Sequence, residues 1–407
     1  MAGKDHARLD ELQRDPYPLY ARARRSEGLI FVPELDAWLV ARDADVREVL
    51  RRPEEFSSVR ALLPDVMPSP AALEVLAKGY GKRPTVVSTD GPAHQRHRAP
   101  LNRGLSAGRI AALVPFAAER AEALVEGFAA DGGVELMAAY AKKLPGQVIG
   151  RLIGLDPADV PVAVHGGYRA EQLLFRPLAP DAQVHAAEDV VALQRLLDTY
   201  VRERRESHRD DLCSGMVAAL APGDGELTLD QRHELVSNLQ NFLIAGHLTT
   251  TALIGTTMLH LLSDRRQWEL ICADPELIPA AVEEAARFDT AVQGFRRTTT
   301  RPVTISGTEL PAGATVFVAY GSANRDEGRY DRPEVFDITR PLSRQHVAFG
   351  HGAHGCPGSQ LAREQLRLTI ELFADRLPGL RLDEGKAPVV MRPTLIHRSP
   401  EALHLLW

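Results

Sequence analysis

The segment with the clearest chemical signal is a glycine-rich loop that contains one of the three cysteines of the chain. Cys356 lies in the run FGHGAHGCPG, residues 349–358, directly before a periodic segment that predicts a helix. A cysteine at a helix start is close to the positive end of the helix and to unpaired N–H groups, which favour the thiolate over the thiol. We therefore predict that Cys356 is a soft metal ligand and that Pro357 takes the first helical position.

Glycines flank this cysteine on both sides. Gly350, Gly352, Gly355 and Gly358 would let the backbone pass close to a flat cofactor and direct N–H groups at the sulfur. Phe349 is expected to pack under the ring of such a cofactor. A lone Gly-Cys pair is more often an ordinary buried cysteine in a turn. The complete spacing Phe-x-x-Gly-x-x-x-Cys-x-Gly favours the ligand site instead.

Phe349, Gly352, Cys356 and Gly358 resemble the haem-binding signature of the cytochromes P450. The resemblance implies haem b (iron protoporphyrin IX) with Cys356 as the axial thiolate. It also implies a monooxygenase that activates dioxygen and inserts one oxygen atom into a small organic substrate. Pro357 departs from the aliphatic residue that is more usual after this cysteine, and this departure bears on the local redox tuning.

A helical segment upstream, PAAVEEAARF, places Glu284 and Arg287 on one face at i,i+3. Taken alone, this spacing is typical of a surface ion pair worth less than about 1 kcal/mol. The resemblance implies that the pair instead joins Arg340 and braces the cysteine loop.

The run LQNFLIAGHLTTTALIGTTMLHLL predicts a long apolar helix that contains Ala245, Gly246 and Thr249. We expect the Thr249 hydroxyl to bond to the Ala245 carbonyl and Gly246 to leave room beside it, which opens a groove. Helix packing through small residues is the alternative. The family resemblance implies an oxygen-binding helix, but Leu248 holds the usual acidic position. We hypothesise that Thr249 and ordered water deliver protons with help from His247, or that coupling is poorer than usual.

Buried haem propionates need cationic or hydrogen-bonding partners. The segment STDGPAHQRHRAPL offers Asp90 as a helix N-cap and places His94 and Arg98 four residues apart on one face. An exposed basic face is the alternative interpretation. The resemblance implies that His94 and Arg98 bind propionates. It also implies that Arg297 and His346 bind the propionates, with Arg296 as the adjacent alternative to Arg297.

The resemblance also suggests which residues contact the substrate. They are the proline-rich segment 61–87, which lacks a clean period and is expected to be a loop over a pocket, and Asn241, Ile244, Ala245, Thr290, Val292 and Ile396. Family members of this size commonly oxidise antibiotics and other secondary metabolites, so we expect a tailoring hydroxylation or related oxidation of a free or carrier-bound substrate. Residues 290–301 and the run GSANRD also resemble members that hydroxylate or demethylate small methoxylated aromatics.

No fused flavin or iron–sulfur domain is expected, so electrons should come from NAD(P)H through a separate ferredoxin and ferredoxin reductase. Arg344, Arg363 and Arg367 are expected to form a basic docking patch. Three alternatives stay open: a non-catalytic haem-thiolate sensor, a peroxide-driven variant, and a zinc enzyme that uses Cys356 with His351 and His354.

The composition is that of an ordinary globular protein, with 407 residues, 44% hydrophobic residues and 25% charged residues. The net charge of −6 argues against a nucleic-acid partner. We expect no membrane span, because apolar runs fall short of about eighteen residues, and no signal peptide, because the first thirty or so residues are dense with charge. Three widely spaced cysteines argue against a disulfide framework and favour a cytoplasmic protein.

The periodicity predicts a mainly α chain with small β-sheets, which the resemblance identifies with the single-domain cytochrome P450 fold over residues 1–407. Strands are expected at LIFVP and AWLVAR, with helices at PLYARARR and from Asp43, and residues 106–264 read as helical almost throughout. Beyond Arg297, PVTISG and ATVFVAY are expected to form a hairpin around TELPAG, and 389–406 an extended segment.

Overall fold

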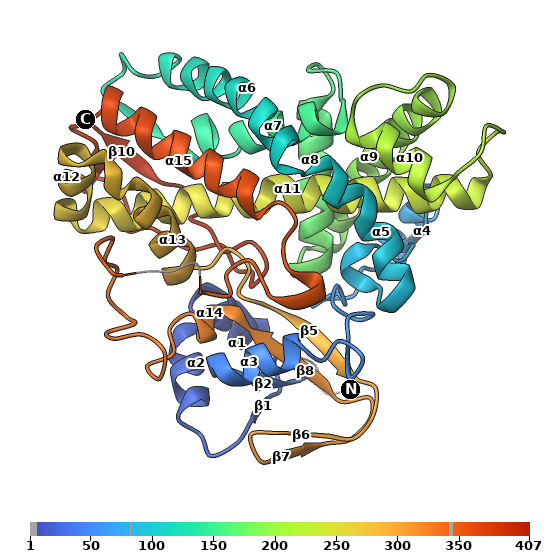
Figure 1. Ribbon diagram of the computed structural model, residues 1–407, viewed down its shortest axis with the longest axis horizontal. Coiled ribbons are helices and arrows are strands. Elements are labelled where there is room, and N and C mark those ends of the chain that lie inside the picture. Colours follow the sequence, from blue (N-terminus) through green and yellow to red (C-terminus); the bar gives the residue numbers. More distant parts are fainter. Residues whose placement is uncertain (1–5, 82, 342–344) are drawn as a thin grey trace. The chain divides into compact units, whose positions relative to one another are not determined.

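The computed structural model describes residues 6–81, 83–341 and 345–407 (Figure 1). As predicted, the chain is mainly helical with small sheets. Its contacts divide it into two compact units. The first comprises Met1–Phe56, Val114–Pro145 and Thr249–Trp407, and the second comprises Ser57–Leu113 and Gly146–Leu248. The single domain expected over 1–407 stays a prediction.

The first unit contains a five-stranded sheet in the order β1-β2-β8-β5-β3. The predicted N-terminal strands are confirmed as β1 (Ile30–Val32) and β2 (Ala37–Val40), and α3 (Asp43–Leu50) follows them as expected. β8 (Thr315–Ala319) pairs parallel to β2 and antiparallel to β5 (Gly294–Thr299), and β3 (Phe56–Ser57) is the edge strand. The sheet positions β5, which carries Arg297.

The predicted hairpin after Arg297 was wrong in its pairing. β6 (Val303–Ile305) pairs with β7 (Thr308–Leu310), which lies inside the run TELPAG that was expected to be the turn. The chain reverses at Ser306 and Gly307, which both have positive φ (46° and 75°). A two-residue turn of this kind matches the twist of a hairpin, so it closes the strands before ATVFVAY is reached. That segment forms β8 and pairs elsewhere.

A second sheet of the first unit joins the C-terminus to the middle of the chain. β10 (His404–Leu406) pairs with β4 (Gly133–Glu135) and with β9 (Arg381–Leu382). The predicted extended segment is therefore a strand only at its end, with one isolated bridge between Met391 and Pro400. β4 interrupts the stretch that was expected to be helical, because pairing with β10 overrides its local pattern.

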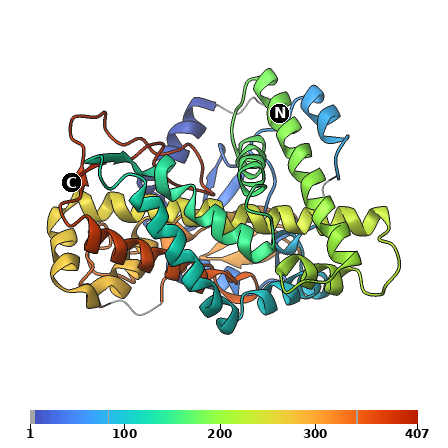
Figure 2. The same cartoon turned by 90° about the horizontal axis from the view of Figure 1, so that it is seen from above.

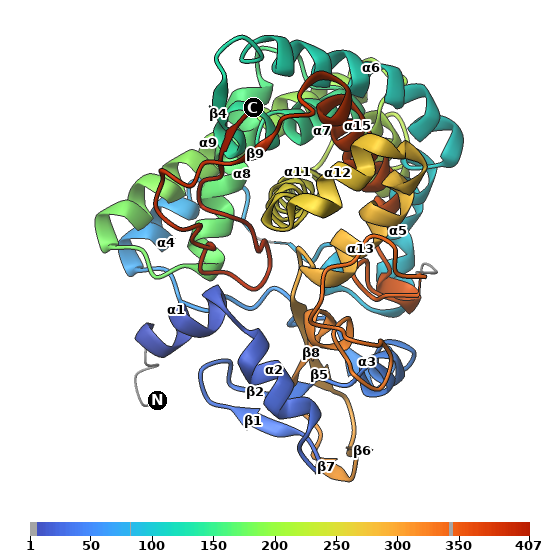
Figure 3. The same cartoon turned by 90° about the vertical axis from the view of Figure 1, so that its left-hand side faces the viewer.

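The cysteine loop is followed by α15 (Ser359–Arg376), the predicted long last helix. Leu366, Ile370, Phe373 and Leu377 are buried, as their spacing predicted. Figure 3 shows α15 beside α12 and α13. The remaining elements of this unit are α1 (His6–Arg14), α2 (Tyr17–Arg24), η2 (Met137–Ala141), α12 (Arg265–Ala273), η3 (Pro275–Leu277), α13 (Ile278–Phe288), α14 (Tyr320–Ala323) and η4 (Gly352–His354).

The second unit is helical. Its elements are α4 (Pro70–Leu76), η1 (Val86–Ser88), α5 (Gly91–Gly104), α8 (Val160–Phe175), α9 (Pro180–Glu206) and α10 (Leu212–Leu220). The segment 61–87 is thus not a plain loop, because it contains α4. Ser69 caps that helix by accepting a hydrogen bond from the Ala72 N–H, and Pro70 begins it. Ala72 is buried in a cluster with side chains of α8 and α9.

Three helices continue along the chain from one unit into the other. They are α6 (Ala107–Glu126), α7 (Leu144–Ile153) and α11 (Leu229–Ser263), the long yellow helix of Figure 2. By length and composition α11 could cross a membrane, so the expectation that no segment is apolar enough was wrong. Of its most apolar window, 72% is buried inside the protein, as in the core helix of a soluble protein.

Candidate functional site

The cysteine loop is held by backbone hydrogen bonds. The Cys356 N–H donates to the Phe349 carbonyl (2.8 Å), the Gly350 N–H to Val347 (2.9 Å) and the Gly355 N–H to Gly352 (3.0 Å). The Cys356 residue is exposed. The prediction that Pro357 takes the first helical position was wrong, because α15 begins at Ser359 with Gly358 as its N-cap. Cys356 therefore lies in the turn that leads into the helix.

Two of the loop glycines are required by the fold of the loop itself. Gly350 and Gly352 have φ values of +71° and +69°, which side chains other than glycine rarely adopt. A Cβ on Gly352 would also lie 2.6 Å from the carbonyl oxygen of Leu50. Gly358 has room for a Cβ within the protein, 3.9 Å from the Cys356 sulfur. Its role as a haem-contacting residue thus stays a prediction.

The other two cysteines are poor candidates for a thiolate ligand. Burial raises the pKa of Cys213 to about 12, and the nearby charge of Asp211 adds to this shift. Burial also raises the pKa of Cys272 on α12. Since only the thiolate binds iron well, Cys356 is the best candidate among the three. The zinc alternative gains no support, because the described part of the chain contains no cluster of three or more potential metal-ligating side chains.

A polar network braces the loop from α13 and α15. Arg363 lies over the ring of Phe349, 4.3 Å from its centroid, and donates two hydrogen bonds to the Glu283 carboxylate (2.5 and 2.9 Å). The Nε2 atom of His346 lies 2.9 Å from the same carboxylate. Burial opposes ionisation of Glu283, but its hydrogen bonds with Arg363 and His346 and the charge of Arg363 outweigh burial and lower its pKa to about 2. Glu283 was not predicted.

This network changes the interpretation of His346. Its Nε2 lies at the Glu283 carboxylate, and its Nδ1 accepts a hydrogen bond from the Ala348 N–H (3.3 Å). Both ring nitrogens thus have partners inside the protein, so the geometry does not support a propionate contact. His346 instead holds the loop.

The basic docking patch is not supported either. Arg363 is largely buried and neutralised by Glu283, and Arg367 forms ion pairs with Glu364 (2.9 Å) and Glu371 (2.6 Å). Arg344 lies outside the described residues.

The structure brings Glu284, Arg287 and Arg340 together. Arg287 and Glu284 form two parallel hydrogen bonds (2.7 and 2.8 Å) and are fully buried, so the surface ion pair is excluded. Arg340 Nε lies 3.4 Å from the same carboxylate, and Arg287 also donates to the carbonyl of Asn324 (2.8 Å). Such a paired, hydrogen-bonded group fixes the geometry of the segments it joins.

Arg297 lies on β5 and lines a small cavity of the first unit. Its neighbours there are His351, His354, Leu50 and Phe56. Arg297 is 4% exposed and donates to the carbonyl of Arg296 (2.8 Å). Arg296 points to the opposite face of the strand, where its guanidinium lies 3.4 Å from the Leu35 carbonyl. The sequence reasoning treated the two histidines only as zinc ligands.

His94 and Arg98 share one face of α5 in the second unit, as predicted. His94 is buried, and burial together with the charge of Arg98 lowers its pKa, so it is neutral at neutral pH. Arg98 donates to the side chain of Asn102 (2.9 Å). Asp90 is the N-cap residue of α5, but its carboxylate binds the Ser57 hydroxyl (2.5 Å) and the Ser58 N–H (2.9 Å) instead of capping the helix.

One face of α11 is partly open. Asn241, Ile244, Ala245 and Thr249 are partly exposed or exposed, whereas Leu248 is 2% exposed. The expected bond from Thr249 to the Ala245 carbonyl stays a prediction.

Gly246 does not open a groove, because a Cβ on this residue would lie 2.3 Å from Cδ1 of Ile149, which fills the space beside it. The alternative of close helix packing explains this glycine.

His247 is a poor candidate for proton delivery beside Thr249. The two residues are two positions apart on a helix and therefore point to opposite sides. His247 is fully buried, its Nδ1 lies 2.6 Å from the Leu243 carbonyl, and its ring packs against Tyr168. The expected help from His247 is not supported.

The predicted substrate residues of the first unit differ in their surroundings. Thr290 is 1% exposed; its hydroxyl donates to the Ala286 carbonyl (3.0 Å) and accepts from Asn324 (2.8 Å). It is thus a structural residue and not a good candidate for substrate contact. Val292 is partly exposed and Ile396 is 8% exposed, and both stay candidates.

Comparisons with known proteins find relatives that cover almost the whole chain. Residues 272–377 match the family model described as Cytochrome P450. The chain is 36% identical over 395 residues to the vitamin D(3) 25-hydroxylase of Pseudonocardia autotrophica, covering 95% of this chain and 92% of that protein. It is 32% identical to the nocardicin C N-oxygenase of Nocardia uniformis subsp. tsuyamanensis, covering 98% and 97%. The structure of cytochrome P450 CREJ in complex with (4-ethylphenyl) dihydrogen phosphate superimposes with a TM-score of 0.89 at 29% identity, covering 97% and 98%.

Proposed function

Because this chain belongs to the cytochrome P450 family and is a P450 monooxygenase, we propose that it performs a tailoring hydroxylation or related oxidation in secondary metabolism. Two of its relatives are named for the oxidation of vitamin D(3) and nocardicin C. Their overlap with almost the whole chain supports a small organic substrate, either free or bound to a carrier.

The observation that carries the proposal is the Cys356 loop. Cys356 is exposed, and Gly350 and Gly352 fix the backbone of the loop. Glu283 braces the loop through its hydrogen bonds with Arg363 and His346. These features fit haem b held through the Cys356 thiolate, with Phe349, Gly350 and Gly358 near the ring. When bound, the haem supplies the iron that activates dioxygen for insertion into the substrate.

Other residues would hold the propionates and position the reactants. Arg297 supplies a buried cation on β5, and His94 and Arg98 supply a hydrogen-bond donor and a charge on α5. Ala245 and Thr249 lie on the open face of α11, where the Thr249 hydroxyl would donate a proton or hold water. Asn241 and Ile244 on the same face, with Val292 and Ile396, would contact the substrate.

A spectroscopic experiment tests the haem ligand directly. The protein is purified with haem, reduced and exposed to carbon monoxide; a Soret band shifted far to the red is expected, because an anionic sulfur donor imposes it. Cys356→Ser should lose that band, and Cys213→Ser should keep it. A protein that binds no haem, or a red-shifted band that persists in Cys356→Ser, would contradict the assignment.

We propose that electrons come from NAD(P)H through a separate ferredoxin and ferredoxin reductase, and that the enzyme is cytoplasmic. Turnover is measured with a ferredoxin system and, separately, with hydrogen peroxide alone. Product only in the first assay supports the proposal. Product with peroxide alone would favour the peroxide-driven variant, and no product in either assay from a substrate that shifts the iron spin state would favour a sensor.

A small aromatic substrate is the second candidate, favoured by the similarity to the P450 structure that holds an aromatic phosphate ester. The oxidation would be a hydroxylation or an oxidative demethylation. A panel of small methoxylated aromatics and of larger secondary metabolites distinguishes the candidates, since a substrate that binds beside the haem would shift the Soret band of the haem-loaded protein from the low-spin to the high-spin position.

A further inference from the structure

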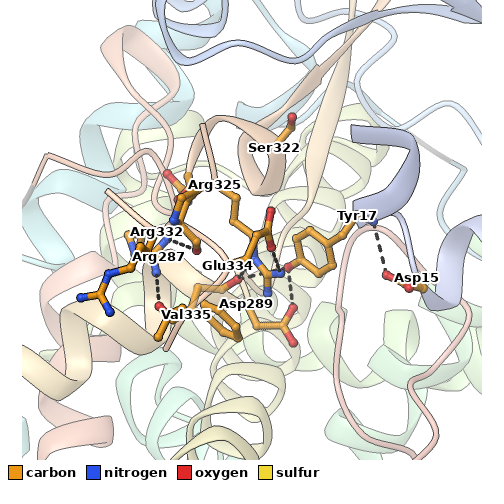
Figure 4. A network of polar contacts seen from close by, with 12 residues as sticks. Asp15, Tyr17, Arg287, Asp289, Ser322, Arg325, Arg332, Glu334 and Val335 are labelled. Carbon is orange, nitrogen blue, oxygen red and sulfur yellow. Dashed lines mark hydrogen bonds and ion pairs between the residues drawn. The ribbon is translucent and has the colours of Figure 1, made fainter. Parts of the chain in front are cut away.

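A buried carboxylate at the end of α13 is not used by the proposed chemistry. Asp289 directly follows the helix and is 2% exposed. It accepts hydrogen bonds from the Tyr17 hydroxyl (2.7 Å) and from Arg398 Nε (2.6 Å), and its second oxygen lies 3.0 Å from His260 Nε2. We call Asp289, Tyr17, His260 and Arg398 the Asp289 network; Figure 4 shows Tyr17 and Asp289 within it.

The charges in this network are fixed. Burial favours the neutral form of Asp289, but the charge of Arg398 and the hydrogen bond to His260 outweigh it and hold the pKa of the carboxyl far below its usual range. Burial raises the pKa of Tyr17, so its hydroxyl stays protonated and donates a hydrogen bond to the Asp289 carboxylate. A nearby cation, Arg325, lies between the rings of Tyr17 (3.6 Å) and Phe288 (3.9 Å).

Such a network is expensive to bury and is seldom the best way to stabilise a core. A buried ion pair can instead specify one arrangement of the segments that carry it. Here Asp289 is at the start of the segment 289–293, and Arg398 is at the end of the segment 395–398. A second nitrogen of the Arg398 guanidinium donates to the carbonyl of Arg14 (2.5 Å), so the guanidinium is held by Asp289 and by Arg14.

These two segments are paired directly. The Gln293 N–H donates to the Leu395 carbonyl (2.7 Å), and the Arg398 N–H donates to the Ala291 carbonyl (2.9 Å). In the segment 289–293, Val292 lies between the bonded residues Ala291 and Gln293. In the segment 395–398, Ile396 lies between the bonded residues Leu395 and Arg398. The bond between Asp289 and Arg398 adds a third link beside them.

We propose that Asp289 is a positioning residue that, through Arg398, fixes the spacing of Val292 and Ile396 and so determines which substrates this enzyme accepts. This inference rests on the proposed substrate contacts of those two side chains. Asp289 itself would not touch the substrate. Replacing the carboxylate by an amide removes the negative charge that the buried Arg398 guanidinium faces, which would shift Arg398 and the segment that carries Ile396.

The test compares two probes that bind haem iron through the same imidazole nitrogen. Imidazole is small, whereas the phenyl group of 4-phenylimidazole extends to the residues that surround the substrate. Both are titrated into haem-loaded wild type and Asp289→Asn, with the Soret band as the signal. The quantity compared is the ratio of the Kd for 4-phenylimidazole to the Kd for imidazole. We expect Asp289→Asn to raise this ratio about tenfold over wild type. Asp211→Asn is the matched control, because Asp211 forms a similar buried pair with Arg204 (2.6 Å) in the second unit; its ratio should stay at the wild-type value.

The outcomes separate the inference from the proposed function. A ratio within about twofold of wild type in a folded Asp289→Asn protein would overturn the positioning role. If this variant does not fold, Arg398→Lys replaces it, because lysine keeps the charge but cannot reach Asp289 and the Arg14 carbonyl at once. A wild-type protein without the red-shifted carbonyl band would contradict the proposed function instead.

Discussion

Gly352→Ala is the substitution whose cost can be worked out most directly from the structure. Gly352 lies in the cysteine loop with φ at +69°, and an added Cβ would meet the carbonyl oxygen of Leu50 at 2.6 Å. Leu50 is the last residue of α3, so its carbonyl is part of a helix end and has little freedom to move. The loop must therefore shift away from α3.

Two costs add up. Alanine in the left-handed region costs about 1–2 kcal/mol relative to glycine. Forcing an extra carbon into a packed position costs about 1–3 kcal/mol more. We expect Gly352→Ala to lower the free energy of unfolding by about 2–5 kcal/mol. Gly313→Ala is the control for the backbone term alone, because φ is +84° there and no atom lies within 4 Å of the added Cβ.

The assay is urea unfolding of the haem-loaded proteins, followed by circular dichroism, together with the fraction of the carbonyl complex that shows the red-shifted band. Gly352→Ala should lose more free energy of unfolding than Gly313→Ala does. It should also lower the fraction of the carbonyl complex that shows the red-shifted band, whereas Gly313→Ala should leave that fraction at the wild-type value. If the two variants lost equal stability to within about 0.5 kcal/mol, the close approach to Leu50 would have no cost and the reasoning would be wrong.

Three further predictions concern side chains of the site. Thr249→Ala should lower product formed per NAD(P)H consumed while substrate still shifts the Soret band; normal coupling would count against its role. Leu248→Asp should raise that yield by restoring an acid, at a stability cost of about 1–3 kcal/mol or more because the position is 2% exposed; an unchanged or lower yield would refute the relay deficit. Glu283→Gln should destabilise the protein most above about pH 4.5 and progressively less as the pH falls toward about 2, because the folded-state pKa of Glu283 is lowered from 4.5 to about 2. Urea midpoints across this range measure the difference, and a pH-independent difference would contradict the ion-pair assignment.

The sequence predicted those features that depend on local spacing. Cys356 and the pair Glu284 and Arg287 were found because their motifs are short. The cap at Ser69 and the turn at Ser306 are equally local, because serine before proline is typical of a helix start and serine before glycine of a hairpin turn.

What could not be predicted depends on partners far along the chain. Glu283 meets Arg363, 80 residues away, and His346, 63 residues away. No local pattern distinguishes a histidine that binds a propionate from one that binds Glu283. In the same way, Gly246 was read as an opening, whereas Ile149, which fills that space, belongs to another helix.

Neighbouring glutamates of α13 serve different segments: Glu283 binds the cysteine loop through His346 and Arg363, and Glu284 binds Arg287, Arg340 and the Asp337 N–H (2.9 Å). Both segments thus depend on one turn of a single helix. Fraying of that turn would release them in the same event, so amide hydrogen exchange in 331–340 and in 346–356 should proceed at a common rate under conditions that favour local opening.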